Sequence, residues 1–259
     1  MPATPQDTPR DGDTMGGFAK GLRVIEAFGE DRERLTIAEV ARAAGLDRAV
    51  ARRCLLTLVQ AGYAEQDGRG FALTPRVLRL GYAWLASRPL PRLLQPWLER
   101  IAEATQDSCS AAVLEGTEIV YVARASQRRV LSIGLNVGSR LPAYCTSMGR
   151  VLLAALPEAA ARAILEKSDR RKLTPATRTG IDEIMVELPR IRDRGHAMSD
   201  EELEIGLRSI AIPIQDGAGR VVAAMNVGGQ AARLAPARMT GEILPLMRQA
   251  QDELRRQVG

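Results

Sequence analysis

Apolar residues early in the chain recur at helical spacing in two short runs. The first run, residues 37–44, begins with a capping box, because the side chains of Thr36 and Glu39 can each satisfy the other's backbone N–H. Gly45 can take the left-handed conformation that ends a helix. Asp47 is placed to cap the second run. The pattern therefore predicts two helices joined by a turn of about three residues.

The second predicted helix has two unlike faces. One face is apolar and consists of two adjacent stripes, Val50, Cys54 and Leu58 beside Ala51, Leu55 and Val59. The other face is polar and carries Arg48, Arg52, Arg53, Thr57 and Gln60. A helix with arginines near its start, set against a shorter capped helix, is the helix-turn-helix layout, whose second helix enters the DNA major groove. A solvated face on an ordinary helix pair is the alternative interpretation.

The flanking segments favour DNA binding. Downstream, residues 63–66 and 71–73 flank an Asp67-Gly68 turn, which predicts a β-hairpin with Arg69 at its tip. Upstream, residues 18–29 predict a third helix, which would bury Leu22, Ile25 and Phe28. Three helices and a hairpin make a winged helix. The candidate DNA contacts are Thr36, Arg48, Ala49, Arg52, Arg53 and Arg69.

Beyond this unit the pattern mixes helices and strands. Thr74 as a cap and Pro75 at the first helical position open a predicted helix at residues 76–86, and another ends near residue 107. Strand patterns follow at residues 109–114, 119–124, 130–135, 209–214 and 221–227. Further helices are predicted at residues 147–155, 157–167, 181–194 and 237–257. The predicted fold class of this part is α+β, an antiparallel sheet with flanking helices.

Length and composition indicate two folded units. The chain has 259 residues, of which 46% are hydrophobic, and this is comfortable for two ordinary cores. We expect a disordered lead-in at 1–16, a winged helix-turn-helix domain at 17–75, a linker helix at 76–90 and a larger domain at 91–259. The start lacks a signal-peptide pattern, and the sequence has no apolar run of about 18 residues. Three cysteines argue against a disulfide framework, so we expect a cytoplasmic protein with no membrane partner.

The net charge adds little to the DNA-binding argument, although +5 and a pI near 9.5 suit a nucleic-acid partner. Residues 1–75 hold 10 Lys+Arg against 11 Asp+Glu, a balance of −1, which leaves +6 for residues 76–259. The local pattern is more informative, because residues 48–53 contain three arginines and no acid.

Several segments together resemble the IclR-type bacterial transcriptional regulators, and among them the regulators of aromatic-acid and β-ketoadipate breakdown. The resemblance covers residues 18 to 257. Its carriers are TIAEVA at 36–41, Gly62-Tyr63, GSRLPAYCTSMGR at 138–150, EELEIGLRSIAIP at 201–213 and AMNV at 224–227. It implies a homodimer or tetramer that binds a pseudo-palindromic DNA operator, with a GAF/PAS-like effector domain at the C-terminal side. It also implies a small carboxylate effector.

The segment around Ser147 is the candidate effector site. Ser147, Met148 and Gly149 lie where a loop becomes a helix, so their free N–H groups and the helix dipole can attract an anion. The resemblance assigns the effector contacts to Ser147 and Met148, with Asp200, Ser209 and Asn226 facing them. Tyr144 would add an aromatic wall. Simple helix capping by Thr146 or Ser147 is the alternative.

An enzyme remains the alternative class of protein, as a cysteine-dependent hydrolase that uses Cys145. A helix start can activate a thiol, but His196 is the only histidine and would have to meet Cys145 across the fold. The sequence has neither a phosphate-binding P-loop nor a dinucleotide fingerprint. We expect no catalytic residue, no cofactor and no metal site.

Overall fold

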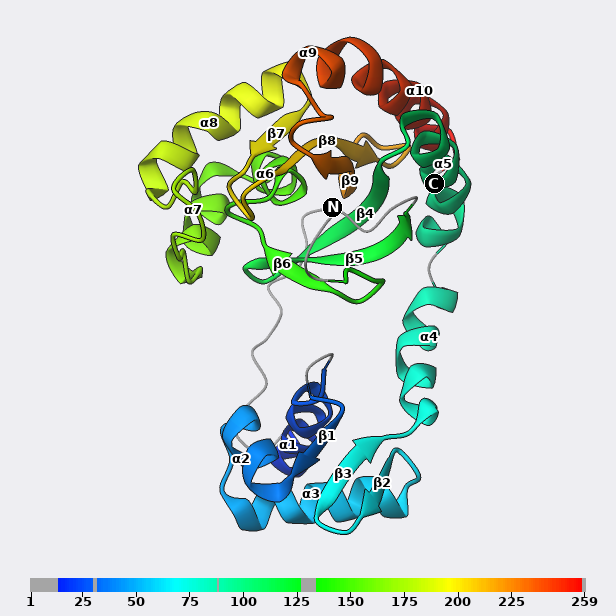
Figure 1. Ribbon diagram of the computed structural model, residues 1–259, viewed down its shortest axis with the longest axis vertical. Coiled ribbons are helices and arrows are strands. Elements are labelled where there is room, and N and C mark those ends of the chain that lie inside the picture. The colour runs from blue at the N-terminus through cyan, green and yellow to red at the C-terminus, as the bar shows by residue number, and fades with distance from the viewer. Residues whose placement is uncertain (1–13, 30–31, 88, 127–133, 258–259) are drawn as a thin grey trace. The chain divides into compact units, whose positions relative to one another are not determined.

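The computed structural model describes residues 14–29, 32–87, 89–126 and 134–257 (Figure 1). The chain forms two compact units, Met1–Ala86 and Ser87–Gly259. Within the described residues no helix is long and apolar enough to cross a membrane.

The first unit contains a helix-turn-helix and a small three-stranded sheet. Its helices are α1 (Gly16–Glu26), α2 (Ile37–Ala44) and α3 (Arg48–Gln60). The sheet has the order β1-β3-β2 and consists of β1 (Arg34–Thr36), β2 (Ala64–Asp67) and β3 (Gly70–Leu73). The predicted helix-turn-helix and hairpin are confirmed, whereas β1 was not predicted.

Local capping chemistry defines the helix-turn-helix, as the sequence predicted. The Thr36 hydroxyl accepts from the backbone N–H of Glu39, and the Glu39 carboxylate accepts from the backbone N–H of Thr36 at 2.8 Å. Gly45 ends α2 in the left-handed conformation with a φ of 62°. The Asp47 carboxylate then accepts from the backbone N–H of Val50 at 2.8 Å and caps α3.

The predicted core face of the first helix is wrong for Leu22, which is 41% exposed. Ile25 and Phe28 are partly buried, and Phe28 packs against the core of this unit. The residue that α1 buries is Val24, and Ala27, directly after the helix, is buried as well. Two residues along a helix correspond to a rotation of about 200°, so a helix that buries Val24 turns Leu22 towards solvent.

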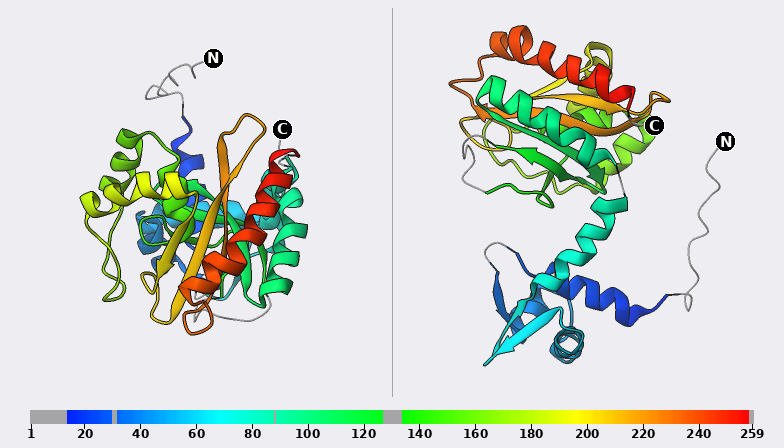
Figure 2. Two further views of the ribbon diagram at one scale, coloured as in Figure 1. Left: turned by 90° about the horizontal axis from the view of Figure 1, so that it is seen from above. Right: turned by 90° about the vertical axis from the view of Figure 1, so that its right-hand side faces the viewer.

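The second unit is a six-stranded antiparallel sheet with helices on both faces (Figure 2). The strand order is β6-β5-β4-β9-β8-β7. The strands are β4 (Ser108–Glu115), β5 (Glu118–Ala125), β6 (Arg140–Pro142), β7 (Ala197–Asp200), β8 (Leu207–Gln215) and β9 (Val221–Gln230). This confirms the predicted α+β class.

The two faces of this sheet have separate cores. On one face lie α5 (Leu90–Thr105), α9 (Pro236–Arg238), the π-helix η2 (Met239–Ile243) and α10 (Leu244–Arg255). On the other lie α6 (Ser147–Ala154), α7 (Glu158–Lys167) and α8 (Ile181–Arg194). The first core is the more uniformly aliphatic, and the second leaves room for polar residues near the start of α6.

Several details differ from the sequence-based expectations. The predicted helix at 76–86 appears as a 3₁₀ turn, η1 (Pro75–Val77), followed by α4 (Leu78–Ser87). Thr74 does not cap it by its side chain, because its hydroxyl donates to the carbonyl of Gly62 at 2.6 Å. The strands β6 and β7 were not predicted. The predicted strand at 130–135 lies outside the described residues except for Gly134 and Leu135, which are not in a strand.

The start of α6 packs very closely against the segment before it. A Cβ atom on Gly149 would overlap the backbone of Ala143, at both its carbonyl oxygen and its Cα. Both neighbours are backbone atoms, which cannot move away as a side chain would. The tight fit fixes where the first turn of α6 stands over the sheet.

We predict that Gly149→Ala lowers the free energy of unfolding by about 1–3 kcal/mol, because the added methyl group overpacks this contact. Urea denaturation of the full chain measures it. Gly241→Ala is the matched control in the same unit, since nothing lies within 4 Å of a Cβ there. It should be neutral or stabilising by up to about 1 kcal/mol. Equal destabilisation by the two substitutions would contradict the packing argument.

Candidate functional site

The polar face of α3 is exposed, as a recognition helix requires. Arg48, Ala49, Arg52 and Arg53 are all exposed on it, whereas Ala51 and Leu55 on the opposite side are completely buried. Within the described residues none of these arginines has a carboxylate partner within 4.0 Å. The face therefore presents uncompensated positive charge to a polyanion.

The other two candidate DNA contacts flank this helix. Arg69 is exposed at the tip of the β2-β3 hairpin, beside Gly68, which has a φ of 57°. Thr36 is also exposed, but its hydroxyl donates to the carboxylate of Glu39 at 2.7 Å. The Thr36 side chain therefore already has a structural role at the start of α2.

The second unit contains a cavity between the sheet and the start of α6. Including the open solvent at its mouth it measures about 530 Å³. The polar lining residues are Ser108, Ser110, Arg124, Thr146, Ser147, Ser199, Ser209 and Asn226. The apolar ones, together with the ring of Tyr121, are Leu135, Leu141, Met148, Leu203 and Leu207.

The sheet brings the serines together. The register pairs Ser108 on β4 with Gly228 on β9, and Gly228 with Ser209 on β8. Ser209 in turn pairs with Ser199 on β7. A row of small polar residues therefore crosses four strands on the α6 face, and it forms the floor of the cavity.

Arg124 is the only charged residue among the described residues that line this cavity. Its guanidinium donates to the hydroxyl of Ser110 at 3.0 Å and to that of Ser108 at 3.4 Å. Within the part of the chain that the structure describes, it has no carboxylate partner. Burial lowers the pKa of Arg124, which means that its charge is poorly compensated.

A β-bulge explains why the sequence analysis missed Arg124. The register pairs Ala111 with Ala123 and Ala112 with Tyr121, so Val122 is the extra residue. Strict alternation would place Arg124 and Tyr121 on opposite faces of β5. The bulge places both on the cavity face. The one available signal is a single charge near the end of the apolar run 119–125.

The helix start has the geometry that the sequence predicted. The Thr146 hydroxyl accepts from the backbone N–H of Gly149 at 3.2 Å and caps α6. The structure assigns no acceptor among the described residues to the backbone N–H groups of Ser147 and Met148. The Ser147 and Ser209 hydroxyls are 2.8 Å apart. Helix capping by Thr146 and a pair of amides free to bind an anion are therefore both present. The capping interpretation and the effector-site interpretation do not exclude each other.

Two of the predicted effector contacts, Tyr144 and Asp200, are not among the residues that line this cavity. Tyr144 is buried, and its hydroxyl donates to the carbonyl of Arg171 at 2.6 Å, away from the cavity. Asp200 is exposed and forms an ion pair with Arg208 at 2.7 Å. The cavity does bring together Ser147, Met148, Ser209 and Asn226.

The residues proposed for a hydrolase do not form a catalytic pair. Cys145 is completely buried, and burial raises the pKa of its thiol to about 12. At neutral pH the thiolate nucleophile is therefore scarcely populated. No described contact joins Cys145 to His196, whose ring Nδ1 lies 3.1 Å from the carbonyl oxygen of Arg194. Among the described residues there is also no cluster of three or more metal-ligating side chains.

The first unit is a winged helix whose α3 exposes arginines without carboxylate partners, and the second unit holds a small polar cavity. Together these two features define a ligand-responsive DNA-binding regulator. The comparisons identify the group. Residues 18–68 match the IclR helix-turn-helix domain, and residues 82–256 match the bacterial transcriptional regulator IclR C-terminal domain. The chain belongs to the IclR family of bacterial transcriptional regulators.

Three similar proteins place it within this family. It is 43% identical over 245 residues to the Pca regulon regulatory protein of Pseudomonas putida, covering 94% of this chain and 84% of the relative. It is 39% identical over 248 residues to the p-hydroxybenzoate hydroxylase transcriptional activator of Acinetobacter baylyi, covering 94% and 92%. The crystal structure of an IclR homologue from Microbacterium hydrocarbonoxydans, complexed with 4-hydroxybenzoate, superposes with a TM-score of 0.77 at 26% identity, covering 94% and 99%.

Proposed function

We propose that this regulator responds to a small carboxylate, an aromatic acid or a β-ketoadipate pathway intermediate, bound in the cavity of the second unit. The observation that carries the proposal is Arg124, a half-buried cation that faces the cavity without a carboxylate partner among the described residues. An acid would supply the missing counter-charge through charge-assisted hydrogen bonds. The structure with 4-hydroxybenzoate supports this class of ligand.

The dimensions of the cavity suit an acid with a second polar group. Ser108, beside Arg124, is separated from Ser209 by β9, and Ser209 contacts Ser147. Neighbouring strands are about 4.8 Å apart, so about 10 Å separate the two polar ends. In the proposed binding mode the carboxylate lies at Arg124. A ring hydroxyl or a second acid group then reaches Ser147, Ser209 and the free amides of α6.

We predict that Arg124→Gln weakens acid binding about 10- to 100-fold, the usual cost of losing a charged hydrogen-bond partner. Calorimetry with 4-hydroxybenzoate, 3,4-dihydroxybenzoate and β-ketoadipate measures it. Arg140→Gln is the matched control, because Arg140 is exposed and already forms ion pairs with Glu115 and Glu118 at 2.7 Å. Wild-type protein that binds none of these acids, or that binds an acid and its methyl ester equally, would refute the carboxylate proposal.

We further propose that α3 reads the operator in the major groove. Arg48, Ala49, Arg52 and Arg53 would face the base edges and adjacent phosphates. Thr36 at the start of α2 and Arg69 on the wing would contact the backbone. The exposure of all six residues supports this assignment.

The arginines should separate into two kinds by their effect on binding. Arg48→Ala and Arg52→Ala should each cost about 1–3 kcal/mol for a base contact and relax specificity at one position. Arg69→Ala should weaken binding to all sequences alike and reduce the salt dependence. Gel shifts on duplexes selected from a random pool test this, with Arg23→Ala on α1 as an exposed control in the same unit. Wild-type affinity of both α3 variants would contradict the assignment.

A homodimer or tetramer is our proposal for the assembly, because one winged helix reads only a few base pairs. On α4 four large apolar residues are exposed, Leu78, Leu80, Tyr82 and Trp84. Leu78 and Tyr82 are the most exposed, at 71% and 64%, and they lie one helical turn apart. The described side chains of α4 therefore support a contact with a second copy.

We predict that light scattering at micromolar concentration gives the mass of a dimer or larger species. Leu78→Ser combined with Tyr82→Ser should lower the average mass and weaken operator binding, because it removes apolar contact area. Leu246→Ser is the control, as Leu246 is a partly exposed leucine on α10, in the other unit. A monomeric wild-type protein would count against the proposal.

A further inference from the structure

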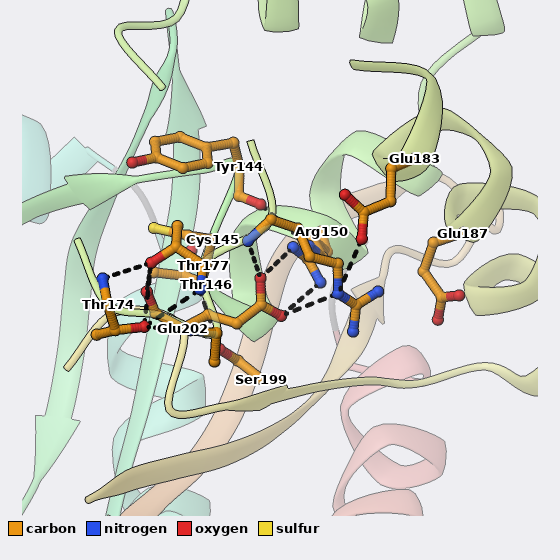
Figure 3. A network of polar contacts seen from close by, with 12 residues as sticks. Tyr144, Cys145, Thr146, Arg150, Thr174, Thr177, Glu183, Glu187, Ser199 and Glu202 are labelled. Atoms are coloured by element: carbon orange, nitrogen blue, oxygen red, sulfur yellow. Dashed lines mark hydrogen bonds and ion pairs between the residues drawn. The ribbon is translucent and has the colours of Figure 1, made fainter. Parts of the chain in front are cut away.

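A fully buried ion pair lies directly behind the wall of the cavity. Arg150 and Glu202 are 1% and 2% exposed. The guanidinium donates to both carboxylate oxygens, from Nη1 to Oε1 at 2.8 Å and from Nη2 to Oε2 at 2.6 Å (Figure 3). Such a pair is retained only where further hydrogen bonds satisfy both groups.

The remaining hydrogen-bonding groups of both residues are also used. Arg150 Nε donates to the carbonyl oxygen of Tyr144 at 3.0 Å, so the same guanidinium holds the segment that precedes α6. The backbone N–H of Arg178 donates to Glu202 Oε2 at 3.1 Å. The Thr177 hydroxyl donates to the backbone carbonyl of Glu202 at 2.6 Å. The ion pair and these hydrogen bonds therefore connect three segments: the residues before α6, the loop that contains Thr177 and Arg178, and the loop 201–206.

These attachment points alternate with cavity-lining residues along the chain. Arg150 follows Ser147 by three residues and Met148 by two in the first turn of α6, and both of these line the cavity. Glu202 directly precedes Leu203, which lines it from the loop 201–206, as does Leu207 after that loop. Glu201 itself has a left-handed φ of 56°, and its backbone N–H donates to the carbonyl of Leu207 at 2.8 Å. The ion pair thus connects two walls of one cavity.

We propose that Arg150 and Glu202 are positioning residues for the effector: their ion pair holds the loop 201–206 against the start of α6 and so sets the shape of the binding cavity. The inference rests on the proposed function, because it assumes that the effector binds in this cavity. Neither residue lines the cavity, so neither touches the ligand. Their effect on affinity is expected to act through Met148 and Leu203.

The alternative is that the pair only stabilises the fold. The chain offers a matched control for this alternative. Asp216 is likewise buried, at 4% exposed, and forms an ion pair with Arg220 at 2.7 Å. Neither residue lines the cavity, and neither is next in sequence to a residue that does. Asp216→Asn therefore removes a buried charge from the same unit without touching the cavity.

The first experiment compares Glu202→Gln with Asp216→Asn in the full chain. Both should lower the melting temperature, because both weaken the hydrogen bonds of a buried carboxylate. Only Glu202→Gln should weaken binding of the three acids named above, by about tenfold, as for the loss of a well-made hydrogen bond. Wild-type affinity in Glu202→Gln, or an equal loss in Asp216→Asn, would overturn the proposal.

A milder pair of variants covers the case in which Glu202→Gln does not fold. Thr177→Val removes the hydroxyl that donates to Glu202, while Thr177→Ser keeps it. We expect Thr177→Val to weaken acid binding several-fold and Thr177→Ser to restore it. Equal affinities in the two variants would overturn the proposal.

Hydrogen exchange gives a readout that needs no ligand. Glu202→Gln and Thr177→Val should each speed exchange both in the loop 201–207 and in the first turn of α6, whereas Asp216→Asn should not. If wild-type protein binds none of the acids, the proposed function fails, and this measurement still decides whether the ion pair orders the two walls. Unchanged exchange at the first turn of α6 in Thr177→Val would refute the positioning role.

Discussion

The six-stranded sheet of the second unit is covered by helices on both faces. This covering constrains which side chains the sheet can carry. A covered face must either be filled with apolar side chains or pair every polar group that it buries. The face under α5 and α10 is filled with apolar side chains. The other face buries polar side chains near the start of α6, and among the described residues no buried side-chain nitrogen or oxygen lacks a partner. A polar cavity can exist inside this unit because its serines are satisfied by one another and by the backbone.

Arg124 gives that polar cavity its positive charge, which is the basis of the proposed acid site, and its place there depends on the bulge at Val122. Serine hydroxyls can hold a guanidinium in place, but they cannot neutralise it, which is why burial lowers its pKa. A bound carboxylate would remove this electrostatic cost, and the pKa of Arg124 would then rise. The proposed site would therefore favour the charged form of an acid over its ester, because only the charged form supplies the missing counter-ion.

The residues that sequence reasoning placed correctly are those whose roles are local. The Thr36 and Glu39 capping box, the Asp47 cap and the Thr146 helix start depend on neighbours three residues away, so the linear pattern contains them. The errors arose where distant segments decide. Strands β1, β6 and β7 have only three or four residues, too few to show an alternating pattern. They form because they pair with neighbouring strands of their sheets. Leu22 fits a helical stripe with Ile25 and Phe28, but packing against α2 and α3 turns the side of α1 that holds Val24 towards the core.

Asp200 shows how tertiary structure resolves an apparent electrostatic conflict. The resemblance implies that this carboxylate lies beside an anionic effector, where it would repel the ligand unless it were protonated or accepted a hydrogen bond from a ligand hydroxyl. In the structure Asp200 pairs with Arg208 outside the cavity, and Arg208 also donates to the carbonyl oxygens of Ala231 and Leu234. The carboxylate thereby stabilises the edge of the sheet instead of opposing the ligand. Among the described lining residues the cavity is left with a single positive charge, so attraction to an acid needs no change in protonation.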